Sequence, residues 1–154
     1  MDAKDWIEKL GLGRHPEGGY FKETYRSDIQ VNLPGCGARS ACTAIYYLLE
    51  GNDFSAFHKI KSDEIWHHYA GSPVFLHVID NDGSLLQIKV GGEQPQAVIK
   101  ADCWFAASVE NRDSFSLVVC TVAPGFDFRD LEFADSKLAA RYPQHQKTIE
   151  KFLR

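Results

Sequence analysis

Residues 74–90 have the sequence VFLHVIDNDGSLLQIKV, in which two apolar runs flank an Asn-Asp-Gly turn. Such a pattern predicts a β-hairpin with strands over 74–80 and 84–90. Around it, from Tyr20 to Cys120, short runs rich in β-branched and aromatic residues alternate with Gly, Pro and Asn turn signals. We count eight or nine such runs about ten residues apart, a spacing typical of a β-sandwich or barrel.

The two ends of the chain have a helical pattern instead. Residues 2–10 place an apolar stripe behind Asp2, a favourable N-cap, and Gly11 follows as a stop signal. Near the C-terminus, residues 135–141 and 144–153 are predicted helices, interrupted by Pro143. Since no repeat or linker interrupts the chain, we expect one all-β domain over residues 1–154 with a short N-terminal helix and one or two C-terminal helices.

Composition excludes several classes of protein. The 154 residues are 44% hydrophobic and 25% charged, which is ordinary for a globular domain and argues against disorder. Seventeen basic against 21 acidic residues give a net charge of -4, so nucleic acid is not an expected partner. No apolar run approaches the roughly 20 residues of a membrane span, and no signal peptide is recognisable. The four cysteines form no CxxC pair, which suggests a reduced, cytoplasmic protein.

The residues best suited to chemistry gather in residues 57–71, FHKIKSDEIWHHYAG. On a β-strand, Glu64, Trp66 and His68 share one face because side chains alternate. A tight turn before Glu64 brings it near His58. A carboxylate beside a histidine fixes the ring and raises its basicity, which suits acid/base catalysis, and the same two side chains could form half of a metal site.

This stretch resembles the first motif of the cupin superfamily, the small jelly-roll barrels. His58, Glu64 and Gly71 match the spacing of that motif, whereas Ile60 occupies the position of its second histidine. In the second motif the ligand position falls on Phe105. Two of the four usual metal ligands are therefore apolar, and we expect neither a metal nor another cofactor.

A narrower resemblance covers most of the chain. The segments HPEGGYFKETY (15–25), TAIYYLLE (43–50), SDEIWHHYAG (62–71) and CTVAPGFDF (120–128) are similar to the cupin family called domain of unknown function 985. This resemblance implies the jelly-roll fold and favours a homodimer, a state that would also protect exposed strand edges. Its nearest functional analogues are the epimerases of dTDP-sugar rhamnose synthesis, which are metal-free cupins with a histidine base.

The leading hypothesis is therefore a metal-free isomerase or epimerase that binds a small metabolite, such as a sugar or nucleotide-sugar. In it, His58 removes a proton beside a carbonyl, Glu64 orients His58, and Tyr47 or Tyr20 returns a proton. Two alternatives remain open: a non-catalytic ligand-binding cupin, and a metal-dependent enzyme that uses His58, Glu64 and His68. The residues expected to bind the ligand are His68, Trp66, Tyr20, Glu23, Tyr25, Phe105 and Asp127.

Several of these residues also have a plainer interpretation. Aromatic side chains usually belong to the core, and Asp127 could cap a turn instead of orienting a histidine. The loop at residues 15–19 contains Gly18-Gly19, which allows a positive φ or a close backbone approach, and could be an ordinary turn. Arg26 could pair with an anionic group or lie on the surface.

Overall fold

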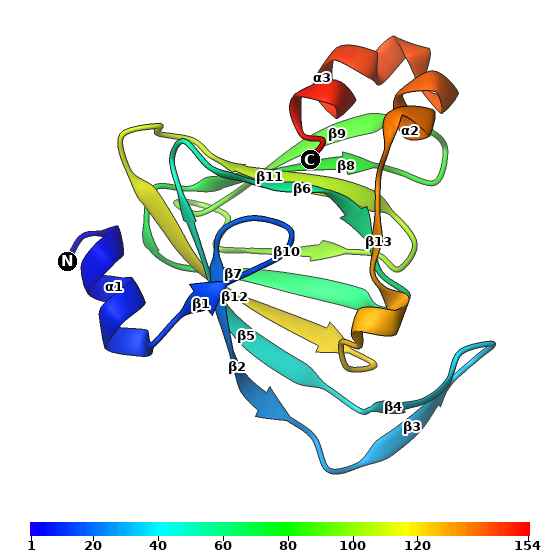
Figure 1. The fold of residues 1–154 in the computed structure, drawn as a ribbon, viewed down its shortest axis with the longest axis horizontal. Coiled ribbons are helices and arrows are strands. Elements are labelled where there is room, and N and C mark those ends of the chain that lie inside the picture. Colours follow the sequence, from blue (N-terminus) through cyan, green and yellow to red (C-terminus); the bar gives the residue numbers. More distant parts are fainter.

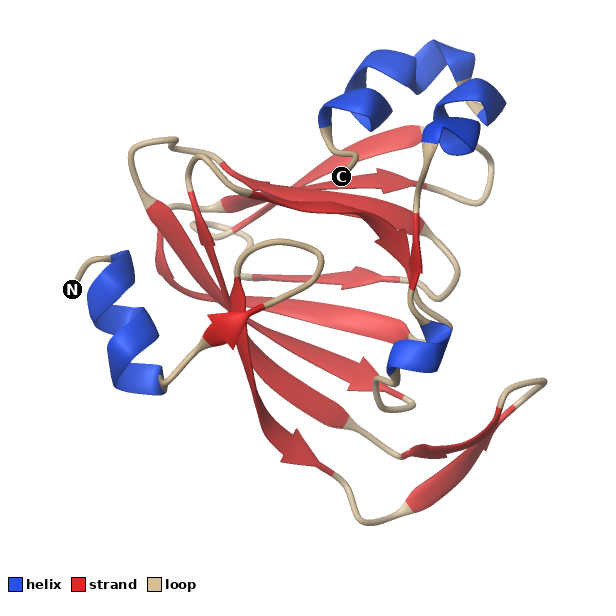
Figure 2. Ribbon diagram, in the orientation of Figure 1, coloured by secondary structure: helices blue, strands red, loops and turns tan.

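The computed structural model describes residues 1–154 and consists mainly of two antiparallel β-sheets that face each other (Figures 1 and 2). The larger sheet contains, in spatial order, β1 (Gly13–Arg14), β2 (Tyr20–Arg26), β5 (Thr43–Glu50), β12 (Phe115–Ala123), β7 (Asp63–Gly71) and β10 (Gln96–Ile99). The smaller sheet contains β13 (Glu132–Phe133), β6 (Phe54–Lys59), β11 (Trp104–Val109), β8 (Val74–Ile79) and β9 (Leu85–Val90). The expected all-β jelly-roll fold is confirmed.

The hairpin predicted over residues 74–90 is present as β8 and β9, which pair from Val74 opposite Val90 to Ile79 opposite Leu85. The strand count was too low, since eleven strands lie between residues 20 and 123. The excess comes from four-residue strands, which lack a long apolar run. These are β10 and a separate hairpin of β3 (Gln30–Leu33) and β4 (Gly37–Ser40), which projects from the molecule (Figure 1).

Helices occur only near the ends of the chain, as expected. Helix α1 (Ala3–Leu10) begins at an Asp2 capping box and ends at Gly11 in the left-handed conformation. Helix α2 (Ser136–Arg141) is capped by Asp135. The predicted helix over 144–153 is shorter than expected: a 3₁₀ turn at Pro143–His145 precedes α3 (Gln146–Lys151). No helix of the protein is long and apolar enough to cross a membrane.

The main core lies between the two sheets and is built around buried aromatic residues such as Tyr47, Trp66 and Phe105. A second cluster forms where α2 and α3 pack on the smaller sheet, and it includes Ile149 and Phe152, which both face inward as predicted. Helix α1 covers one end of the outer face of the larger sheet. Because side chains alternate along β5, β12 and β7, the inward-facing residues of these strands form one wall of the core and of the pocket described below.

Candidate active site

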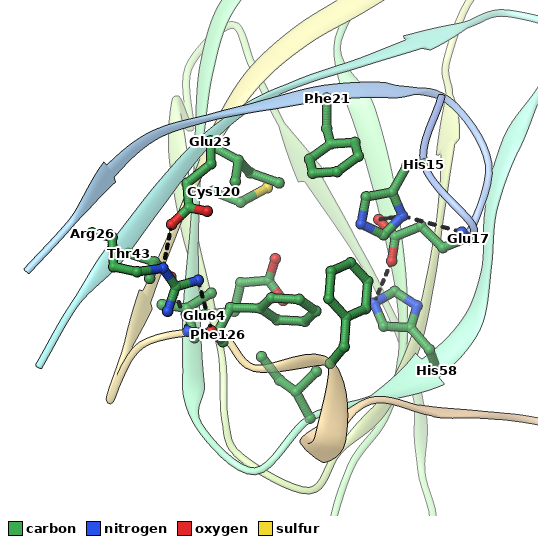
Figure 3. A pocket seen from close by; sticks show the side chains of 14 residues that line it. His15, Glu17, Phe21, Glu23, Arg26, Thr43, His58, Glu64, Cys120 and Phe126 are labelled. Carbon is green, nitrogen blue, oxygen red and sulfur yellow. Dashed lines mark hydrogen bonds and ion pairs between the residues drawn. The ribbon is translucent and has the colours of Figure 1, made fainter. Parts of the chain in front are cut away.

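A pocket with a cavity of about 70 Å³ lies among β2, β5, β6, β7 and β12 and the segment that follows β12 (Figure 3). Its walls are partly apolar and include three phenylalanines, Phe21, Phe126 and Phe128. Its polar lining is unusual for the interior of a β-sandwich because it is rich in ionisable groups. These are His15, Glu17, Glu23, Arg26, His58 and Glu64.

His58 and Glu17 form a buried ion pair at one side of this pocket. The Nε2 atom of His58 lies 2.9 Å from a carboxylate oxygen of Glu17, and both side chains are less than a tenth exposed. Burial alone would lower the pKa of His58, but the charge of Glu17 and their hydrogen bond outweigh burial and raise it to about 9. Burial likewise opposes ionisation of Glu17, yet the charge of His58 holds the pKa of Glu17 below its ordinary value.

This pair corrects the sequence prediction, in which Glu64 was the carboxylate that orients His58. Glu17 reaches His58 because the loop after β1 folds back onto β6, where the Glu17 carbonyl accepts a hydrogen bond from the Ala56 amide at 2.9 Å. The glycine pair makes this docking possible. Gly18 has a φ of +108°, and a Cβ there would lie 2.1 Å from the Phe54 carbonyl oxygen. The sequence signal was thus the glycine pair next to Glu17, which we considered without assigning a role to the glutamate.

His15 is a further pocket residue that the sequence analysis did not select. Its side chain is 6% exposed, and its ring packs edge-on against Phe21 with the centroids 4.5 Å apart. Its Nδ1 atom accepts a hydrogen bond from the Glu17 amide at 3.1 Å. Burial lowers the pKa of His15, so the ring is neutral at physiological pH.

Glu64 lies in the same pocket as His58, as strand alternation predicted, but it has no hydrogen-bonding or ion-pair partner of good geometry. The residue is 8% exposed and has Cys120 beside it on the pocket wall. Burial raises the pKa of Glu64 to about 7, with the attraction of His58 acting in the opposite direction. Glu64 is therefore a buried carboxyl group that gains and loses a proton near neutral pH.

The mouth of the pocket carries a second ion pair, Arg26 with Glu23, whose atoms lie 2.6 Å apart. Glu23 was predicted at this position. Tyr25 was also predicted there, but it is 54% exposed and faces away. The reason is a register shift between Glu23 and Tyr25 on β2, which reverses the alternation so that Arg26 points into the pocket.

Three predicted site residues form the core behind the pocket. Tyr47 is fully buried, and its hydroxyl donates a hydrogen bond to the Gly18 carbonyl at 2.6 Å. Burial also raises the pKa of Tyr47 well above its usual range. Because its hydroxyl hydrogen is engaged by Gly18 and its side chain does not line the pocket, Tyr47 does not fit the predicted role of proton donor. Phe105 packs against the His58 ring, 4.2 Å between centroids, and Trp66 packs edge-on against both Tyr47 and Phe105.

The remaining predicted residues do not reach the pocket. The ring of Tyr20 lies under the guanidinium of Arg14, whose central carbon is 4.3 Å from the ring centroid. A ring nitrogen of His68 lies 3.1 Å from the Ser72 carbonyl oxygen. Asp127 caps the 3₁₀ turn at Phe128–Asp130 and pairs with Arg129, so the turn-capping interpretation was correct and ligand contact was not.

The donor set does not fit a bound metal. His68, which the metal-dependent alternative required, is absent from the pocket lining, and Ile60 occupies the second histidine position there. No three His, Cys, Asp or Glu side chains anywhere in the protein are arranged to hold a metal ion. Proton transfer among histidines and carboxylates is the chemistry that this pocket can perform by itself.

Comparison with known proteins agrees with this architecture. Proteins from three organisms are similar over most of the chain, among them an uncharacterised protein of Saccharomyces cerevisiae and a hypothetical protein of Leishmania major. The protein from Saccharomyces cerevisiae is 34% identical, over 82% of this chain and 72% of its own length. Solved structures of proteins from Leishmania major and Shewanella oneidensis are both 36% identical, cover at least 98% of each chain, and have TM-scores of 0.92 and 0.90.

More distant structures share the fold alone. They include an oxalate decarboxylase from Bacillus subtilis (14% identity, TM-score 0.60, 90% of this chain and 36% of that one). The capsular polysaccharide assembling protein CapF from Staphylococcus aureus is another (11% identity, TM-score 0.62, 80% and 32%). Residues 4–134 match the family described as cupin superfamily, DUF985. With this match and the whole-chain relatives, the chain belongs to that family of cupins, the domain of unknown function 985.

Proposed function

We propose that the pocket binds a small carbonyl compound and moves a proton at the carbon next to its carbonyl group, as a metal-free isomerase or epimerase does. The observation that carries this proposal is the cluster of two histidines and two glutamates around one small, partly aromatic cavity. Environments that push the pKa values of neighbouring groups apart are typical of acid/base catalysis. Here His58 titrates at about 9 and Glu64 at about 7.

The size and charge of the cavity narrow the class of ligand. A water needs roughly 10–15 Å³ of such space, so the cavity of about 70 Å³ admits a group of about five to seven non-hydrogen atoms. The rest of a larger molecule would extend past Arg26 at the mouth. Because His58 is already paired with Glu17 and Arg26 with Glu23, no unpaired cation inside would bind an anionic group. The reacting end is therefore uncharged, such as the aldehyde or ketone end of a sugar.

The comparisons support this proposal only at the level of fold. Cupins with similar architecture include an enzyme, the oxalate decarboxylase, and a protein of polysaccharide assembly. One fold hosts many functions, so neither supplies a substrate here.

The test is a panel of neutral hydroxy-aldehydes and hydroxy-ketones, from glyceraldehyde and dihydroxyacetone upward, incubated with the protein in deuterated buffer. We expect thermal stabilisation by at least one compound and incorporation of deuterium next to its carbonyl, above the rate without protein. Glu93→Gln, a surface change on the turn between β9 and β10, serves as the control and should exchange normally. Tight binding without exchange would refute the proposed isomerase or epimerase activity and would identify the protein as a ligand-binding cupin instead.

A further inference from the structure

The hydrogen bonds of His58 leave neither of its ring nitrogens free for a substrate. Its Nδ1 lies 2.6 Å from the Ala56 carbonyl oxygen, which can only accept, so Nδ1 carries a hydrogen. Its Nε2 lies 2.9 Å from the Glu17 carboxylate. When Glu17 is ionised, Nε2 also carries a hydrogen. The pair is thus internally satisfied, which argues against His58 as the base that the sequence suggested.

His15 has the opposite arrangement. Its Nδ1 accepts a hydrogen bond from the Glu17 backbone N–H, so the hydrogen of the neutral ring sits on Nε2. No protein acceptor engages that nitrogen, and Figure 3 shows the His15 ring at the edge of the open centre of the pocket. The backbone of the Glu17 loop therefore fixes one tautomer and leaves one free N–H donor facing the cavity.

Glu64 supplies the complementary group. Of the three pocket carboxylates, Glu17 is engaged by His58 and Glu23 by Arg26, whereas Glu64 has no ion-pair partner and only the Cys120 thiol and the Trp66 N–H close to it. It is more than nine-tenths buried, and its carboxylate points into the pocket in Figure 3. A buried carboxylate without a counter-ion and a fixed N–H donor thus share one small cavity.

We propose that Glu64 is the base that takes the substrate proton and that His15 is the donor that holds the substrate's carbonyl oxygen. The Glu17–His58 pair acts through His15 as a positioning unit. This assignment rests on the proposed function and sharpens it. With one free carboxylate, the same group removes and returns the proton, which suits a shift between neighbouring carbons of a hydroxy-aldehyde or hydroxy-ketone.

Every proton and electron pair is accounted for when this isomerisation is written step by step. Glu64 takes the proton from the hydroxyl-bearing carbon, the C–H electron pair becomes the carbon–carbon double bond of an enediol, and the carbonyl π pair moves to oxygen. The His15 N–H gives its proton to that oxygen, and the nitrogen recovers a proton from the neighbouring hydroxyl. Protonated Glu64 then returns its proton to the former carbonyl carbon, so substrate and product are isomers and no other reactant is needed.

The first test needs no substrate. Nitrogen-detected NMR of histidine-labelled protein at neutral pH should show His15 as the neutral ring with hydrogen on Nε2, and His58 with hydrogens on both nitrogens. The Glu64 carboxyl carbon should titrate near pH 7. Finding hydrogen on Nδ1 of His15, or an unprotonated nitrogen on His58 at neutral pH, overturns the assignment even if no compound in the panel reacts.

The second test uses whichever panel compound exchanges deuterium with the wild type. Glu64→Gln should slow exchange by about a hundredfold to ten-thousandfold, the usual effect of removing a general base. Glu17→Gln combined with His58→Gln replaces the ion pair by neutral amides. If the pair only positions His15, this double variant loses markedly less exchange than Glu64→Gln.

The dependence of exchange on pH separates the two candidate bases. With Glu64 as base, the rate rises with pH through about 7, and the double variant keeps this rise because it removes opposite charges together. With His58 as base, the rate would rise through about 9 and the double variant would lose it. A folded double variant as inactive as Glu64→Gln, or a Glu64→Gln variant that exchanges normally, refutes the assignment.

Discussion

Replacing Glu17 by Gln should change the protonation of His58 and, through it, the stability of the fold. The pKa of His58 is raised from its ordinary 6.5 to about 9 by the charge and hydrogen bond of Glu17, which together outweigh burial. Without that charge, only the charge of Glu64 and the hydrogen bond to the Ala56 carbonyl oppose burial, so the pKa of His58 falls well below 9. At about 1.4 kcal/mol per pKa unit, the raised pKa represents about 3 kcal/mol of stability.

The sign of this effect fixes its dependence on pH. A group whose pKa is raised by folding stabilises the protein fully below its unfolded pKa of 6.5 and loses that contribution as the pH rises through about 9. In the variant most of this contribution is lost, because burial disfavours the charged form of His58. The wild type should therefore exceed Glu17→Gln in stability by up to about 3 kcal/mol near pH 6, and by little near pH 10.

Urea unfolding at a series of pH values measures this difference, and NMR follows the titration of His58 in both proteins. Glu23→Gln is the matched control because it removes a carboxylate from the partly exposed pair with Arg26 at the pocket mouth. Exposed pairs contribute at most about 1 kcal/mol, so its effect should be small and nearly independent of pH. A pH-independent loss of stability in Glu17→Gln, or a His58 that still titrates near pH 9 in the variant, would contradict the argument.

Three further outcomes are expected. Gly18→Ala should lose at least about 2 kcal/mol in urea unfolding, because its Cβ would meet the Phe54 carbonyl oxygen at 2.1 Å; a normal midpoint would disprove the tight docking. The outer face of the larger sheet exposes Tyr69 and Val98, so light scattering should report a homodimer that Tyr69→Glu dissociates, whereas an unchanged mass argues against this interface. Elemental analysis should find far less than one transition metal per chain, and a stoichiometric, stabilising metal would show that the donor set was misjudged.

The parts of the fold that were predictable from the sequence are those that depend on neighbouring residues. The Asn-Asp-Gly turn between β8 and β9, the Asp2 cap and the Gly11 stop each act within a few positions of the chain. The placement of Glu64 on the inner face of β7 followed from the alternation of a regular strand. Such local rules located one half of the site.

The other half depends on contacts between distant segments. Glu17 meets His58 only because the loop between β1 and β2 docks on β6, about forty residues away, and periodicity contains no information on that docking. Arg26 replaces Tyr25 at the mouth because of one register shift in β2. A single extra residue reverses every inward and outward assignment beyond it, so strand alternation fails at irregular positions.

The energetics of the Glu17–His58 pair also bear on whether the pocket has a function. Replacing a buried ion pair by well-packed apolar residues is often neutral or stabilising, so packing alone gives little reason to keep charges between the sheets. The surrounding residues make such a replacement geometrically simple, since Phe105 and Ile60 already line this region. Two histidines and two glutamates around one cavity of about 70 Å³, with Glu64 lacking a counter-ion among them, instead match the requirements of proton transfer. A double substitution of Glu17 and His58 by apolar residues that stabilises the fold but displaces the His15 ring would show that the pair is retained to orient His15 and not to hold the fold together.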